Sequence, residues 1–86
     1  MPEENLMSPH RIHLEKCHPQ RNRFRFYGLS LEPNLFGGWS LVREWGRIGR
    51  AGRMHADLYP TLAAAQLALD IKLREKGRKG YHGRHA

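Results

Sequence analysis

Apolar and polar side chains alternate along four stretches of the chain, which is the pattern of half-buried β-strands. The stretches are residues 10–17, 21–31 and 54–59, together with one that begins at Trp39. Phe24 and Phe26 share one face of the second strand, and Gly28 is a candidate bulge where its alternation changes. Residues 18–20 and 32–38 are rich in turn formers, so short turns are predicted to join antiparallel neighbours.

A helical period replaces the strand pattern after Pro60. Thr61 is a suitable N-cap, the predicted helix covers residues 62–76, and Gly77 is expected to be its C-cap. The apolar stripe at helical spacing consists of Leu62, Ala65, Leu69 and Leu73. This order of elements predicts an α+β fold. An antiparallel sheet of four to five strands has one helix packed on one face, and its other face is partly free.

A length of 86 residues allows one domain. Residues 1–9 are polar and hold two prolines, so they are predicted to be a flexible leader before a domain at residues 10–81; residues 82–86 form a basic tail. No apolar run is long enough to span a membrane, and the acidic start of the chain does not resemble a signal peptide. With Cys17 as the only cysteine, no internal disulfide can form. We therefore expect a cytoplasmic protein without a membrane partner, which can associate with the nucleoid.

The charge balance indicates the kind of partner. Lys and Arg number 15 against 8 Asp and Glu, so the formal net charge is +7. A domain this basic favours a polyanion, with nucleic acid first and an anionic membrane second, although basic charge can also serve solubility alone.

The positive charge concentrates in the stretch WSLVREWGRIGRAGR, which runs from Trp39 to Arg53. Period-two alternation places Trp39, Leu41, Arg43, Trp45 and Arg47 on one face. Glycines then recur every third residue, each followed by an arginine. Arginine forks match phosphate oxygens, and an exposed tryptophan can stack on a base or sugar. Because Trp45 has arginines on both sides of it on its face, we expect it to be exposed, whereas Trp39 is expected in the core.

The candidate nucleic-acid-binding residues combine this strand and corner with the basic end of the helix. They are Arg43, Trp45, Gly46, Arg47, Arg50, Arg53, Lys76, Arg78 and Lys79. Catalytic chemistry finds little support, since no carboxylate pair lies in a plausible pocket. No CxxC or HExxH motif is present, and the glycine-rich corner does not lead directly into a helix as a dinucleotide loop does. We therefore expect no enzyme activity, no metal and no cofactor.

The triplet Trp45-Gly46-Arg47, within REWGRIG, resembles the signature of the WGR domain family. That domain accompanies several DNA-dependent poly(ADP-ribose) polymerases and also occurs alone or in other bacterial proteins. The resemblance extends over about residues 10–81. Its flanking features are Asn22-Arg23-Phe24 before a strand, Pro60-Thr61 at the helix start, Ala65 and Leu69 in the helix, and Glu75-Lys76 followed by an aromatic residue.

The resemblance implies an antiparallel sheet with one helix and DNA binding near strand breaks. It also implies that the Trp45 ring packs on a terminal sugar of the DNA. Arg47 matches an arginine that, in the polymerases, also makes contacts between domains. Because these 86 residues show no catalytic or zinc-finger segment, we expect no ADP-ribosyl transfer, and Tyr81 stands where the family often has tryptophan.

Our hypothesis is therefore a non-enzymatic module that binds double-stranded DNA at ends or nicks. A protein adaptor whose basic face docks an acidic partner, and an RNA-binding module, remain alternatives. The sequence leaves the oligomeric state open.

Overall fold

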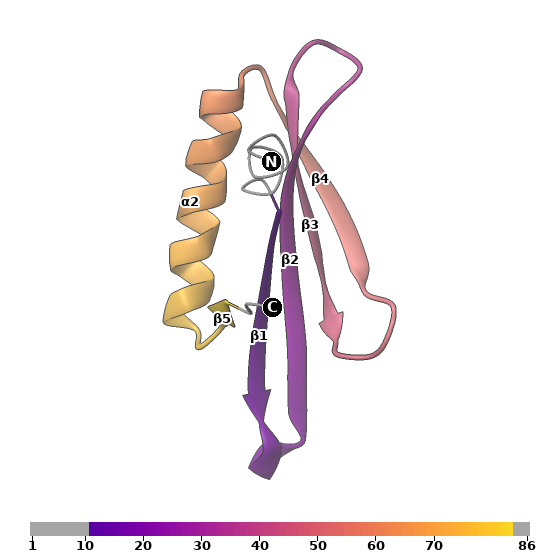
Figure 1. Cartoon of the computed structure of the whole chain (residues 1–86), viewed down its shortest axis with the longest axis vertical. Coiled ribbons are helices and arrows are strands. Elements are labelled where there is room, and N and C mark those ends of the chain that lie inside the picture. The colour runs from indigo at the N-terminus through magenta and orange to yellow at the C-terminus, as the bar shows by residue number, and fades with distance from the viewer. Residues whose placement is uncertain (1–10, 84–86) are drawn as a thin grey trace, which may run out of the picture.

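The computed structural model describes residues 11–83, which form a five-stranded sheet and one long helix (Figure 1). In chain order the elements are β1 (Arg11–His18), the 3-10 helix η2 (Pro19–Arg21), β2 (Arg23–Pro33), β3 (Trp39–Arg47), β4 (Arg53–Tyr59), α2 (Leu62–Arg78) and β5 (His82–Gly83). The strand order is β4-β3-β2-β1-β5, and every neighbouring pair is antiparallel. The predicted α+β fold is confirmed.

Helix α2 covers one face of this sheet, and the core lies between the two (Figure 1). The sheet contributes the buried side chains Leu14, Tyr27, Leu29, Leu31 and Leu41, and the helix contributes Ala65 and Leu69. Leu62 and Leu73 pack against this cluster from the same stripe of the helix. The predicted helix face is therefore confirmed.

The alternation of side chains alone did not determine which face of β2 is buried. Tyr27, Leu29 and Leu31 are buried under the helix, so Phe24 and Phe26 lie on the opposite, uncovered face. There the ring of Phe26 stacks on His13, with centroids 6.0 Å apart. The bulge predicted at Gly28 was wrong, because this residue pairs with His13 and Glu44 in unbroken registers.

The helix ends later than the sequence indicated. It runs to Arg78, so Gly77 is inside it and not its C-cap. The chain reverses at Gly80, whose φ of +95° favours glycine, and the amide of Tyr81 donates to the carbonyl of Lys76 at 3.0 Å. The sheet then gains β5, two residues beyond the domain boundary predicted at residue 81. The predicted leader at residues 1–9 and residues 84–86 of the tail lie outside the described residues.

The three glycines of the basic corner have different structural roles. Only Gly49 has a positive φ, +89°, in the turn between β3 and β4. A Cβ on Gly52 would meet the carbonyl oxygen of Trp45 and the ring of Phe26, and one on Gly46 would lie 3.0 Å from the Cα of Gly52. Two of these glycines thus allow the backbones of the corner to pack closely, which explains the spacing without an anion-binding loop.

The far end of the β2–β3 hairpin carries no positive charge. No Lys or Arg occurs in residues 31–42 or 54–71. At the hairpin tip Leu35 and Phe36 are 99% and 87% exposed, and the side chain of Asn34 accepts hydrogen bonds from the amides of Phe36 and Gly38. The cations therefore gather toward the other end of the molecule. Among the described residues, no helix has the length and apolar character needed to cross a membrane.

Replacing Leu69 by alanine tests the packing of α2. The side chain is 6% exposed between helix and sheet, so Leu69→Ala is expected to lower the free energy of unfolding by about 2 to 4 kcal/mol. The matched control is Leu67→Ala on the same helix, where 61% of the residue is exposed and, at low protein concentration, a change within about 0.5 kcal/mol is expected. Urea unfolding measures both, and equal losses would contradict the assigned helix face.

Candidate nucleic-acid interface

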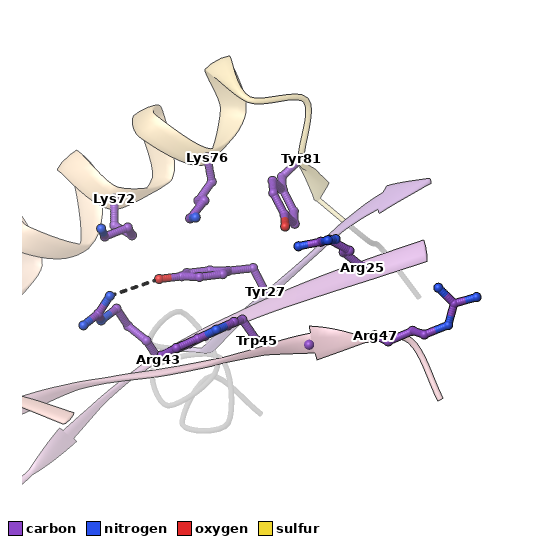
Figure 2. Close-up of a pocket in the computed structure, with 9 residues that line it drawn as sticks. Arg25, Tyr27, Arg43, Trp45, Arg47, Lys72, Lys76 and Tyr81 are labelled. Carbon is purple, nitrogen blue, oxygen red and sulfur yellow. Dashed lines mark hydrogen bonds between the residues drawn. The ribbon is translucent and has the colours of Figure 1, made fainter. Parts of the chain in front are cut away.

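A pocket of about 440 Å³ opens between the C-terminal half of α2, the first half of β2 and the last half of β3 (Figure 2). Period-two alternation brings side chains of both strands to this face, and the i, i+4 spacing of two lysines places both on the same side of the helix. The lining residues are Arg25, Tyr27, Arg43, Trp45, Gly46, Arg47, Lys72, Lys76 and Tyr81. Five of them are cationic, three are aromatic and none is acidic.

Tyr27 is the central ring of this pocket. It is 4% exposed and stacks on Trp45, with centroids 6.0 Å apart and planes inclined by 22°. Tyr81, just beyond the helix, meets it edge-on at 6.1 Å. The cross-strand register that pairs Tyr27 with Trp45 brings two of these rings together, and the turn after α2 brings the third.

Arg43 is held beside these rings by several contacts. Its Nη1 donates to the Tyr27 hydroxyl at 3.4 Å, its Nη2 lies 3.4 Å from a carboxylate oxygen of Asp57, and its guanidinium carbon is 5.7 Å from the Trp45 ring. The hydrogen bond that Arg43 donates to the Tyr27 hydroxyl raises the pKa of Arg43 above its ordinary value, so its positive charge is permanent. Its Nε is buried and has no hydrogen-bond partner among the described residues.

Lys76 projects from α2 over the aromatic floor (Figure 2). Its Nζ lies 4.4 Å from the ring centroid of Tyr27 and 5.5 Å from that of Tyr81, which are cation–π distances. Partial burial lowers the pKa of Lys76, and the nearby charge of Lys79 lowers it further. The ammonium group therefore lacks full solvation and gains from an anion placed beside it.

Arg47 lines the rim of the pocket but is directed elsewhere. It donates to the backbone oxygen and the side-chain oxygen of Asn22, each at 3.1 Å, and Figure 2 shows its guanidinium turned away from the rings of Tyr27 and Trp45. Asn22 accepts both bonds from a left-handed conformation, with φ of +52°. This contact ties the end of β3 to the turn between β1 and β2.

The remaining predicted residues lie outside the pocket. Arg50 is exposed in the β3–β4 turn, and Arg53 is exposed next to Trp45 in the β3–β4 register. Arg78 and Lys79 are exposed at the end of α2, where the Lys79 ammonium lies 3.7 Å from Glu75. The structure thus brings together Arg43, Trp45, Gly46, Arg47 and Lys76 but spreads the other four predicted residues around them.

The two tryptophans differ less than expected. Trp39 is half-buried and packs against the core, in accord with its predicted place. Trp45, predicted to be exposed, is also half-buried and packs against the same cluster, because Tyr27 lies beneath its ring. Trp45 therefore belongs both to the core and to the pocket.

Four lining residues were missing from the predicted set, namely Arg25, Tyr27, Lys72 and Tyr81. The spacing of Lys72 and Lys76 was a usable signal, since residues four apart share a helix face. Tyr27 follows from the face of β2 that is buried. No pattern around Tyr81 indicates that the chain turns back onto the sheet.

Fold and pocket together define a small α+β domain with a cationic, aromatic pocket at one end. The family model of the WGR domain matches residues 10–86, and the chain belongs to this family. It is also similar to an uncharacterized protein, y4dW, of Sinorhizobium fredii (strain NBRC 101917 / NGR234), with 42% identity over 80 residues. The match covers 92% of this chain but 39% of that relative, so the chain spans less than half of its length.

No solved structure matches the chain. The resemblance noted at Trp45-Gly46-Arg47 is confirmed at the level of the family. Membership in this family is consistent with a non-catalytic module that binds nucleic acid. Among residues 11–83 no group of three or more His, Cys, Asp or Glu side chains could hold a metal ion.

Replacing Trp45 by alanine tests whether its ring supports the fold. Because the ring is half-buried on Tyr27, Trp45→Ala is expected to lower the free energy of unfolding by about 2 to 3 kcal/mol. Trp45→Phe keeps an aromatic ring over Tyr27 and should recover about half of the loss. Urea unfolding of the three proteins measures this, and an unchanged stability for Trp45→Ala would show that the ring is only a surface platform.

Proposed function

We propose that this domain binds DNA through the cationic, aromatic pocket and catalyses no reaction. The observation that supports the proposal is the composition of the pocket, in which five cations surround three aromatic rings without a lining carboxylate. Guanidinium and ammonium groups bind phosphate oxygens, and aromatic rings pack on sugars and bases, so this combination suits a nucleotide.

The shape of the pocket favours a single nucleotide unit. Its volume of about 440 Å³ lies within the usual range of small-ligand sites, roughly 300 to 1,000 Å³. The sugar or base face of a nucleotide becomes available to a ring where stacking is interrupted. Ends and nicks of double-stranded DNA provide such nucleotides, and they are the DNA features that we assign to this site.

Arg43 and Lys76 are suited to hold the phosphate of that nucleotide. The Arg43 Nε lacks a partner among the described residues, and Lys76 is incompletely solvated. The Lys76 ammonium group would gain from phosphate oxygens the hydrogen bonds that it lacks in the free protein, and the exposed part of the Arg43 guanidinium adds a permanent charge beside it. The exposed cations around the pocket would contact phosphates farther along the backbone. They are Arg50, Arg53, Arg78 and Lys79.

Titrating the protein with labelled nucleic acids tests this function. One sequence is prepared as a nicked circle, a linear duplex, a closed circle, a single strand and an RNA. If about four cations each neutralise a phosphate, log K should fall with log salt with a slope of about −3 to −4. Nicked and linear DNA should bind at least about tenfold more tightly than the closed circle, provided a ring packs on an exposed nucleotide. Equal affinity for all duplexes would contradict end recognition, and tighter binding of RNA would redirect the proposal to an RNA partner.

Lys76→Gln removes one pocket cation, and its matched control is Arg74→Gln, which removes an exposed cation of the same helix outside the pocket. The pocket variant should weaken binding to nicked DNA by about 1 to 3 kcal/mol and flatten the salt slope by about one unit. The control should change the affinity by less than about 0.5 kcal/mol. Equal losses would show that only the overall charge matters.

The lowered pKa of Lys76 gives the binding a pH dependence. Since the charged form holds the phosphate, affinity should decline as the pH rises through this pKa, which burial holds below the ordinary lysine value. Lys76→Arg keeps the charge at alkaline pH and should remove the decline. Binding isotherms from neutral to alkaline pH measure this, and an identical decline in both proteins would assign it to another group.

A further inference from the structure

The two edge strands of the sheet, β5 and β4, differ in length and in how they are protected. On one side β5 pairs with Leu14 and Glu15 of β1. On the other side β4 is the outermost strand, and no described strand pairs with its outer backbone. Proteins usually protect such an edge with proline, lysine or a bulge, but β4 has neither residue and pairs with β3 in an unbroken register over seven residues.

Exposed apolar side chains gather along this same edge. Met54 and Leu58, on the uncovered face of β4, are 66% and 62% exposed. Leu67 and Ile71 of α2 are 61% and 54% exposed, and Ile71 lines a hollow together with Asp57 of β4. Leu67 precedes Ile71 by one helical turn and shares its side of the helix. Exposed apolar side chains therefore border β4 on both sides, with Met54 and Leu58 on the uncovered face and Leu67 and Ile71 on the helix above the other face.

We propose that the β4 edge binds a second copy of this chain, so that two sheets join into one continuous antiparallel sheet. The sequence of β4 is complementary to itself when the two-fold axis passes through Ala56. Met54 then faces Leu58 of the other copy, His55 faces Asp57, and Arg53 faces Tyr59. Apolar residues then meet apolar residues and a guanidinium meets an aromatic ring, which are favourable cross-strand pairs. Each Asp57 carboxylate, which already bonds to His55 of its own chain at 2.9 Å, gains the imidazole of the other copy as a second partner.

Other registers are less favourable. An axis at Asp57 would place two carboxylates directly opposite each other, which destabilises a strand pair. An axis at His55 would pair the two histidines and leave Leu58 beyond the paired part of the strand. Only the axis at Ala56 pairs all seven residues from Arg53 to Tyr59. The register is therefore specified by charge and by length.

The helices leave room for this dimer. An axis perpendicular to the joined sheet keeps both helices on the same face, and α2 packs mainly against β3. The two β3 strands would lie three strand spacings apart, about 14 Å, which exceeds the 8 to 10 Å between closely packed helices. The helices then run antiparallel without collision, and Leu67 and Ile71 of each face the gap between them. The dimer does not depend on the proposed DNA binding.

Sedimentation equilibrium of the full chain over a range of concentrations tests the dimer. The wild-type mass should rise with concentration from the chain mass of 10.0 kDa to twice that value. Leu58→Lys and, independently, Leu67→Glu should raise the dimer dissociation constant at least about tenfold while leaving the melting temperature of the monomer unchanged. Leu35→Lys, at the exposed hairpin tip, is the matched control and should not alter the constant.

A wild-type chain that stays monomeric up to millimolar concentration would overturn the proposal. A dimer that Leu35→Lys dissociates, or that Leu58→Lys and Leu67→Glu leave intact, would overturn the assignment to β4.

Two further experiments, a residue swap and a cross-link, test the register itself. His55→Asp places two carboxylates opposite each other across the axis and should dissociate the dimer, and adding Asp57→His should restore it, since the swap again sets an imidazole opposite each carboxylate. In the swapped protein the new carboxylate at position 55 lies opposite Arg43 in the β3–β4 register, which favours the monomer fold. In a Cys17→Ser background, Ala56→Cys should give a disulfide-linked dimer, because only this position faces itself across the axis. A failure of the swap to restore the dimer, or a stronger cross-link from Leu35→Cys, would contradict this register.

Discussion

The stacking of Tyr27 on Trp45 joins the hydrophobic core to the pocket, and the rest of the site depends on it. Tyr27 is buried among the leucines of the sheet, while its ring carries Trp45 on one side, meets Tyr81 at its edge and lies beneath the ammonium group of Lys76. Its hydroxyl also accepts a hydrogen bond from Arg43. Two of the five pocket cations, Arg43 and Lys76, are therefore positioned by a residue of the core.

Much of the fold could be predicted because its signals are local. Alternation located the strands, and the stripe that contains Ala65 and Leu69 identified the packed face of the helix. The orientation of β2 was harder, since Phe24 and Phe26 suggest an apolar face as clearly as Tyr27 and Leu29 do. Which of two apolar faces is buried depends on where the helix lies above the sheet. That is a tertiary constraint, and a single strand does not encode it.

The site could be predicted in part for the same reason. Arg43 and Trp45 share a strand face, which alternation reveals, and the basic end of the helix contributed Lys76. Tyr81 reaches the pocket only because the chain reverses at Gly80 and adds β5 to the sheet, a long-range pairing of two residues with no periodic signal. Arg47 illustrates the converse. Its position in the sequence matches a phosphate contact, but its guanidinium is held by Asn22, 25 residues earlier in the chain.

The separation of charge along the molecule has a kinetic consequence. With no Lys or Arg in residues 31–42 or 54–71, the hairpin tip is neutral or weakly acidic while the opposite end is strongly basic. The domain therefore has a large electric dipole moment along its length. In the field of a polyanion this dipole rotates the molecule before contact, so that the basic end leads and Leu35 and Phe36 trail. Such steering shortens the orientational search and can raise association rates by about 10- to 1,000-fold at low ionic strength.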